Sequence, residues 1–366
     1  MFTIYYLAAP LLLIDLAANP IQLGLVGTLA SSVHMGMAHL MGGLSDRVGR
    51  RRLIIAAPMI FTATCLIMTQ LNVFWMILAL SLVNGLCLSI YWPSLQAWIA
   101  DRHTGIDLAR DIGSFNMSWT AATLAGPIFS GFLYSISPRL PFISAALIAL
   151  MLFAVLFTSI HENTLDRATD TETVHLETSN RKMEFLYAAW VANFASWFIM
   201  GNARYQFPKL ARELNIPPHI IGLILGFVGF ALFLGFFLLR RSDGWQFKKD
   251  HLFGAQILAL VGVALIVVSN RSMLFALAFV MIGLSCSLTY YSSLYYALHL
   301  LRRRGKGSGL HESIVGAGAV SGPILGGVAA QSAGLRAPYL LCIVVLLAAV
   351  GVEVLLLRKI NGSTTR

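Results

Sequence analysis

The stretch GGLSDRVGRRRLI, from Gly42 to Ile54, lies between two long apolar segments and places one acidic residue and four arginines in a single short loop. Its glycines and Ser45 are small enough to let neighbouring membrane helices approach closely. Asp46 is a costly charge at the end of a membrane helix, and the arginines are typical of a cytoplasmic loop. The stretch therefore predicts a cytoplasmic turn between two transmembrane helices.

Composition gives the same fold class for the whole chain. Of 366 residues, 57% are apolar and only 11% are charged, which excludes an ordinary soluble domain. Apolar runs near the roughly 20 residues that cross a bilayer as a helix recur about twelve times and are too long for tilted barrel strands. These runs lie at about 1–16, 21–44, 53–70, 73–98, 110–135, 140–160, 184–206, 218–239, 251–268, 272–299, 308–331 and 337–358.

The net charge of +10 reflects membrane topology rather than a nucleic-acid partner. With the Gly42 loop inside, the inner loops and the C-terminal tail hold 20 of the 26 lysines and arginines, and the outer loops hold 6. This bias predicts that both termini are cytoplasmic, in a multi-pass protein of the bacterial cytoplasmic membrane. The four cysteines fall inside predicted spans, so we expect no disulfide, metal site or cofactor.

The chain reads as a duplicated six-helix unit. Residues 161–183 are charged and poor in large apolar side chains, as expected of a cytoplasmic linker between bundles at 1–160 and 184–366. Shifts of 196 to 198 positions align glycines and prolines of the first half with those of the second. The aligned pairs include Pro20 with Pro218, Gly24 with Gly222, Pro127 with Pro323, and Gly131 with Gly327.

The same alignment predicts a truncated first helix. The expected seventh helix begins near Glu184, and its counterpart would precede Met1 by about fourteen residues. The first run is therefore shorter than the roughly 20 residues that a bilayer requires. We expect that the true start lies upstream of Met1 or that the sequence begins at an internal methionine.

The Gly42 loop resembles the signature between the second and third helices of the major facilitator superfamily, and the segment IADRHTGIDLAR after helix four is similar to that family too. The resemblance implies an all-α fold of two six-helix bundles related by a pseudo-two-fold axis. It also implies a latch on the cytoplasmic side, although the arginines could serve topology alone. The residues expected in this gate are Gly42, Asp46, Arg47, Gly49, Arg50, Arg51, Asp101 and Arg110.

Two further segments, AATLAGPIFSG from Ala121 and GAVSGPILGG from Gly318, resemble the superfamily's glycine-proline motif, which is associated with exchangers when it lies in helix five. The fuller version lies in helix eleven. Close helix packing by small residues is an equally good explanation. The residues concerned are Gly126, Pro127, Gly131, Gly318, Gly322, Pro323, Gly326 and Gly327.

The resemblance implies a central cavity lined by helices one, four, seven and ten. Aromatic faces with a few hydrogen-bonding groups suit an organic solute. Arg204 would suit an anionic group, but its place near the outer end of helix seven also permits snorkelling. The cavity candidates are Asn84, Tyr91, Trp92, Asn193, Trp197, Arg204, Tyr290 and Tyr291.

Ionisable groups within the spans are candidates for proton coupling. His34 and Glu312 are the two that we single out, with a helix–helix hydrogen bond as the alternative role of His34. Where related drug exporters carry an arginine in helix four, this chain has Ser81, so the proton-antiport mechanism does not follow from the fold.

Together these features predict a secondary transporter that moves a small organic solute by alternating access, with export slightly favoured over uptake. The expected partners are the solute, the lipid bilayer and a coupling ion such as H⁺, and we expect a monomer. The alternative is a non-transporting membrane receptor or assembly protein that keeps the fold. An enzyme is not expected, because the sequence has no metal-ligand spacing, nucleophile elbow or phosphate-binding loop.

Overall fold

The computed structural model describes residues 1–100, 105–159, 180–241, 244–301 and 304–362. These residues form thirteen α-helices and no strand. In chain order the helices are α1 (Phe2–Asp15), α2 (Pro20–Val48), α3 (Arg50–Met68), α4 (Phe74–Ala100), α5 (Gly105–Ile136), α6 (Leu140–Ser159), α7 (Asn180–Tyr205), α8 (Phe207–Glu213), α9 (Pro218–Leu239), α10 (Lys249–Val268), α11 (Ser272–Leu300), α12 (Arg304–Ala333) and α13 (Ala337–Gly362).

Helix boundaries follow from local sequence. The Asn19 side chain accepts a hydrogen bond from the backbone of Gln22, and the Gln22 side chain accepts one from the backbone of Asn19, so α2 begins with a capping box. Gly49 separates α2 from α3 with φ of 101°, and Gly334 separates α12 from α13 with φ of 91°. This left-handed backbone region strains most other residues, which explains glycine at both turns.

The helices match the expected spans with two differences. Eight of the described helices are long and apolar enough to cross a membrane, while α1 is shorter, at 14 residues. The expected seventh helix begins at Asn180 rather than Glu184, so its first turn occupies part of the segment assigned to the linker. It also breaks at Gln206 and continues as α8, a short helix that the apolar pattern did not indicate.

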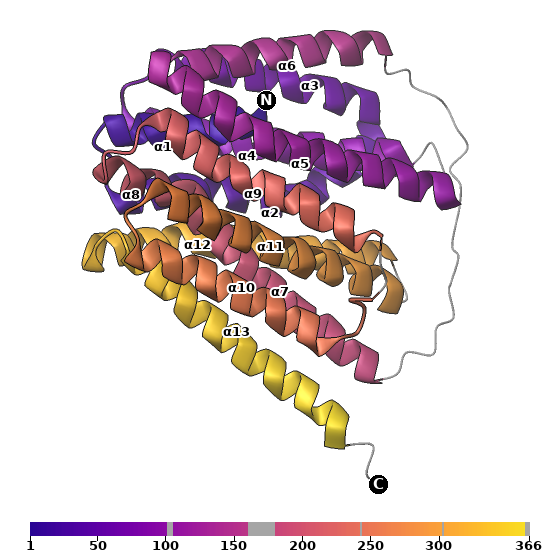
Figure 1. Cartoon of the computed structure of the whole chain (residues 1–366). Helices are drawn as coiled ribbons and strands as arrows, with labels where there is room; N and C mark the ends of the chain where they lie inside the picture. Colours follow the sequence, from indigo (N-terminus) through magenta and orange to yellow (C-terminus); the bar gives the residue numbers. More distant parts are fainter. Residues whose placement is uncertain (101–104, 160–179, 242–243, 302–303, 363–366) are drawn as a thin grey trace.

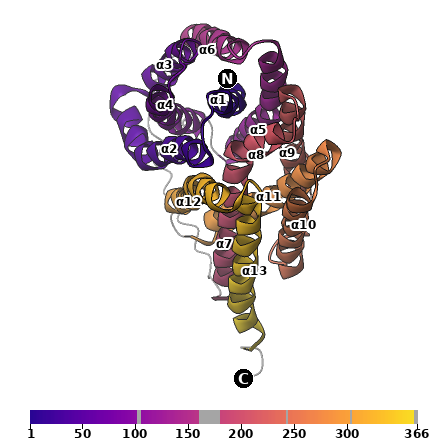
Figure 2. The ribbon, with the colours of Figure 1, turned by 90° about the vertical axis from the view of Figure 1, so that its left-hand side faces the viewer.

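The helices form two bundles, α1–α6 (the N-terminal bundle) and α7–α13 (the C-terminal bundle), as Figure 1 shows. In Figure 2, α1 lies inside a ring made by α2 to α6. The bundles meet along two interfaces, where α2 packs against α12 and α5 packs against α9. We call the end of the molecule that carries the turn between α1 and α2 the Asp15 end. The opposite end, which carries the turn between α2 and α3, is the Gly49 end.

The two interfaces repeat one design. A Cβ atom on Gly24 of α2 would overlap the Pro323 carbonyl of α12, and one on Gly222 of α9 would overlap the Pro127 carbonyl of α5. These are the glycines and prolines that the internal repeat aligns. A second pair of overlaps links Gly131 with the Pro218 carbonyl and Gly327 with that of Pro20. Glycine at these positions lets the helix backbones of opposite bundles touch.

Candidate functional site

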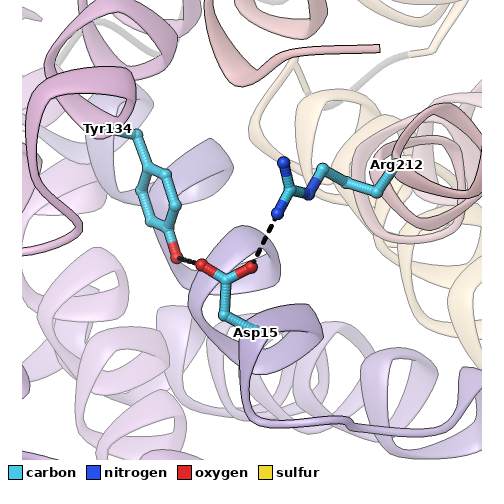
Figure 3. Close-up of polar contacts among 3 residues, drawn as sticks. All are labelled: Asp15, Tyr134 and Arg212. Carbon is cyan, nitrogen blue, oxygen red and sulfur yellow. Dashed lines mark hydrogen bonds and ion pairs between the residues drawn. The ribbon is translucent and has the colours of Figure 1, made fainter. Parts of the chain in front are cut away.

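The Asp15 end is closed by polar contacts between the bundles. Asp15, at the end of α1, pairs with Arg212 of α8, with 3.0 Å between the carboxylate Oδ1 and the guanidinium Nη2. The Tyr134 hydroxyl of α5 donates to the other carboxylate oxygen over 2.6 Å. Figure 3 shows Asp15 between these two partners. One acidic group thus joins three helices from both bundles.

Gln206, at the break between α7 and α8, lies deeper in the same closure. Its side chain is buried, and its amide nitrogen donates to the carbonyls of Pro20, 3.1 Å away in the N-terminal bundle, and Pro323, 3.2 Å away in its own bundle. Nearby, the Lys209 ammonium donates to the Ala18 carbonyl over 2.9 Å. The bonds to Pro20 and Ala18 join the two bundles at this end.

The second interface has its own bond at this end. The Ser135 hydroxyl of α5 accepts from the backbone N–H of His219 on α9 over 3.1 Å, and it lies 3.2 Å from the His219 Nδ1. Further in, the Arg204 guanidinium lies 4.1 Å from the centre of the Tyr6 ring, a cation–π contact between α7 and α1. Arg204, a cavity candidate from the sequence, is therefore placed with the Asp15-end contacts.

The described close contacts of α2 with α12 lie on the part of α2 that reaches from the Asp15 end to Met35. The first of these contacts is at Gly24. The Thr28 hydroxyl donates to the Val320 carbonyl over 2.7 Å, and Met35 packs at Gly316. Beyond these, a Cβ on Gly36 or Gly43 would meet nothing within 4 Å. Leu40, 58% exposed, continues this open face.

Between the two ends lies a cluster of aromatic rings centred on Tyr290 of α11. The ring centres of His311, Phe236, Trp197 and Trp119 lie 4.6, 5.8, 6.1 and 6.3 Å from that of Tyr290. They come from α12, α9, α7 and α5, so both bundles contribute. We call these five residues the ring cluster; Tyr290 and Trp197 were expected from the sequence, and the other three were not.

A buried polar chain supports the ring cluster. The Asn193 amide of α7 donates to the Ser293 hydroxyl over 3.3 Å, and that hydroxyl lies 2.8 Å from the His311 Nδ1. Three buried polar atoms have no hydrogen-bond partner among the described residues: the Asn193 Oδ1, the His311 Nε2 and the Trp197 Nε1. Buried polar atoms normally find partners, so these three atoms are exceptions to that rule.

Of the remaining cavity candidates, those on α4 have partners outside the ring cluster, whereas Tyr291 of α11 adjoins the cluster, with its ring centre 6.1 Å from that of Phe236. Trp92 of α4 packs against Phe115 of α5 at 5.4 Å and against Tyr91, also at 5.4 Å. Asn84 is buried on the same helix, and its Oδ1 has no partner within the described chain. Tyr291 packs against Trp245, with ring centres 5.5 Å apart. The internal repeat relates Trp92 and Phe115 to Tyr290 and His311, so each bundle carries one such ring pair.

The glycine-proline motif residues lie at close helix contacts. A Cβ on Gly126 would overlap Thr3 of α1. On α12, substitution of Gly318 or Gly322 would bring a Cβ against the backbone of α7 at Phe194 or Phe198. Gly326 faces the Asn202 side chain with similarly little room.

The expected cytoplasmic gate is described only in part. Asp101 lies outside the described residues, as do the side chains of Asp46 and Arg110. Arg47 is exposed. The guanidinium of Arg51 donates to the Phe157 carbonyl at the end of α6 over 3.0 Å, and that of Arg50 lies 3.4 Å from the Ser45 hydroxyl. A Cβ on Gly42 would meet Pro93 of α4 at 3.9 Å.

The two proton-coupling candidates have different surroundings. The His34 side chain on α2 is partly buried, and its Nδ1 has no hydrogen-bond partner in the described chain. Glu312 is exposed on α12 and is adjacent in sequence to His311 of the ring cluster. Glu312 therefore lies beside the ring cluster, and His34 lies on the face of α2 near the opening. Among the described residues, no group of three His, Cys, Asp or Glu side chains could hold a metal ion.

Comparisons with known proteins agree with this geometry. The family model described as Major Facilitator Superfamily matches residues 1–201 and again 189–364. The tetracycline resistance protein of class C from Escherichia coli is 34% identical over 30% of this chain and 28% of its own length. The quinolone resistance protein NorA from Staphylococcus aureus is 22% identical over 42% of this chain and 39% of its own. The aligned region spans less than half the length of each of these relatives.

Solved structures match almost the whole fold. A variant of the nucleoside transporter NupG superposes with a TM-score of 0.74, covering 97% of this chain and 96% of its own at 14% identity. A bacterial homologue of the human lysosomal transporter Spinster, in an inward-facing and occupied conformation, gives the same TM-score over 97% of this chain and 93% of its own, at 16% identity. At these identities the likeness concerns the fold.

Proposed function

Because the chain belongs to the major facilitator superfamily, we propose that it moves a small organic solute across the membrane by alternating access, with the two bundles rocking about the ring cluster. The observation that carries this proposal is the contrast between the ends. Hydrogen bonds and an ion pair join the bundles at the Asp15 end, while toward the Gly49 end a Cβ on Gly36 or Gly43 of α2 would meet nothing within 4 Å.

The state of the transporter follows from orientation. The excess of lysine and arginine in the loops of the Gly49 side assigns that side to the cytoplasm. With this orientation, we propose that the structure corresponds to an inward-open state and that the protein resides in the bacterial cytoplasmic membrane. Opening to the outside would require the Asp15-end contacts to break.

The ring cluster favours a planar aromatic solute. Edge-to-face contacts with tryptophan and tyrosine rings bind flat apolar groups, and the unpartnered atoms of Asn193, His311 and Trp197 could hydrogen-bond to a polar edge. Export fits this assignment, because relatives are named for tetracycline and quinolone resistance. Those names describe the relatives, and the solute of this chain is to be found by screening planar aromatic compounds.

The test is solute counterflow in proteoliposomes with compounds first selected by thermal shift. Tyr290→Ala and Trp119→Ala should reduce counterflow at least tenfold, because the first removes the central ring of the cluster and the second removes the ring that the N-terminal bundle contributes. Trp75→Ala is the matched control, since Trp75 is 70% exposed and remote in sequence from the cluster. If compounds bind but none is transported, the chain is a receptor that keeps the fold, and the proposal is wrong.

We also propose that Asp46 and the loop arginines form a latch that closes the Gly49 end when the Asp15 end opens. Asp46→Asn should then lower turnover more than solute affinity, and an unchanged transport rate would contradict this role.

Proton coupling through Glu312 or His34 is a separate proposal. Glu312→Gln or His34→Ala should abolish the dependence of transport on a pH gradient if that residue carries the proton.

A further inference from the structure

A buried carboxyl group lies away from the ring cluster, on the far helices of the C-terminal bundle. Glu353 of α13 has no exposed surface, and Gln256 of α10 is 1% exposed. The Gln256 amide nitrogen donates to the Glu353 Oε1 over 2.7 Å. The other carboxyl oxygen, Oε2, and the amide oxygen of Gln256 are both buried, and neither has a partner among the described residues.

The charge state of Glu353 decides whether this arrangement is stable. An ionised carboxylate would be fully buried between membrane helices with a single neutral hydrogen bond, which leaves most of its desolvation cost uncompensated. It would also leave the buried amide oxygen of Gln256 without a donor, which is unfavourable. A proton on Glu353 removes both of these energetic costs.

We propose that Glu353 is a proton-binding site, occupied at neutral pH, in which the carboxylic acid and the Gln256 amide form a cyclic pair. The Oε2–H group donates to the amide oxygen while the amide N–H donates to Oε1. An amide carries a donor and an acceptor side by side, which is the pattern that a protonated carboxyl group complements. The pair then satisfies all its buried polar atoms and fastens α13 to α10.

The surroundings contain no group that would hold the ionised form. The helices packed against α13 are α7, α10 and α12. None of their described ionisable side chains makes a hydrogen bond or ion pair with Glu353. These are Lys182, Glu184, Tyr187, Arg204, Tyr205, Lys249, Asp250, His251, His311 and Glu312, and on α13 itself Tyr339, Cys342 and Arg358.

This site differs from the proton-coupling candidates in what it does. Glu312 is exposed beside the ring cluster, whereas Glu353 is enclosed by protein and joins two helices of one bundle. A proton there would stay bound throughout the transport cycle. Its role would be to hold the outer helices together, so the inference stands whether or not the chain transports a solute.

The experiment is infrared difference spectroscopy of the purified full chain, wild type minus Glu353→Gln, at neutral pH. Glu353→Gln keeps the shape and an amide partner for Gln256, so the variant should fold and melt at the wild-type temperature. We expect the difference spectrum to contain the carbonyl band of one protonated carboxylic acid and no carboxylate bands. Carboxylate bands in place of the acid band would overturn the proposal.

Two further variants keep the test independent of folding defects. In Glu312→Gln the Glu353 acid band should persist, and its loss would mean that the band belongs to Glu312. Gln256→Leu removes the partner, so the acid band should shift as the carboxyl loses its hydrogen bonds, while an unshifted band would contradict the pair. The melting temperature of the wild type should fall at alkaline pH as Glu353 ionises. The melting temperature of Glu353→Gln should not show this fall.

Discussion

The two ends of the molecule are built from the same repeated helices yet make different contacts. At the Asp15 end, glycines bring the backbones of opposite bundles together, and Asp15, Gln206 and Lys209 add polar bonds between the bundles. At the Gly49 end, a Cβ atom on Gly36 or Gly43 of α2 would meet nothing within 4 Å. The α2 glycines in close contact with the other bundle, Gly24 and Gly27, thus lie toward the Asp15 end, so substitutions on α2 should have opposite consequences at the two ends.

The largest expected effect comes from filling a backbone contact at the Asp15 end. In Gly222→Leu, the new side chain would occupy the space of the Pro127 carbonyl, which should cost about 3 kcal/mol through overpacking. Gly36→Leu is the matched control, because its Cβ has open space. Melting temperature in detergent should fall for Gly222→Leu and stay unchanged for Gly36→Leu. Equal losses would remove the distinction between the ends.

The next effect should come from Gln206. Gln206→Leu leaves the Pro20 and Pro323 carbonyls without their side-chain donor, a loss of about 1–2 kcal/mol for buried acceptors. Since one of these bonds joins the bundles, the variant should populate the outward-open state more. The measurement is labelling of a single cysteine placed at Ala18. The four native cysteines are buried, so background labelling should be low. Unchanged labelling would show that Gln206 does not hold the closure.

A smaller effect is expected from Asp15→Asn. The pair with Arg212 is partly exposed, with 33% and 37% of the two side chains accessible, so the charge contributes about 0.2–1 kcal/mol. Asn can still accept from Tyr134, which reduces the loss further. Labelling at Ala18 should rise by no more than about fivefold, and high salt should produce a similar rise in the wild type. A salt-independent effect would point to packing instead.

The smallest effect should come from the Gly49 end. Gly43→Ala adds a methyl group to an exposed helix position and should stabilise the helix by up to about 1 kcal/mol. Neither the melting temperature nor the labelling at Ala18 should decrease. A destabilised Gly43→Ala protein would mean that this face of α2 packs against the other bundle in the resting state.

Much of the fold could be predicted from the sequence because hydropathy alone marks membrane helices. The repeat also paired Gly24 with Gly222 and Pro127 with Pro323. The repeat could not show which of these residues touch. In the structure, a glycine of one bundle contacts a proline of the other. A sequence shift relates positions within each half, whereas contact depends on how the halves are rotated against each other.

The site was predictable only in part, for physical reasons that differ between residues. Tyr290 and Trp197 stood out as aromatic residues on cavity helices, but nothing in the sequence singled out His311, because its partner Ser293 lies on another helix. Gln206 and Arg212 belong to a helix break that apolar periodicity does not reveal. Glu353 was missed because one carboxyl near the end of an apolar run reads as a helix-end charge until its burial is known.

The most direct test of the account is a reversible cross-link across the Asp15 end. Ser135 and His219 touch across the α5–α9 interface, so Ser135→Cys/His219→Cys can be joined by a short thiol-cleavable reagent. The account predicts that the cross-linked protein still binds solute from the Gly49 side but loses counterflow, and that cleavage restores it. Full counterflow in the cross-linked protein would contradict the claim that this end must open for transport.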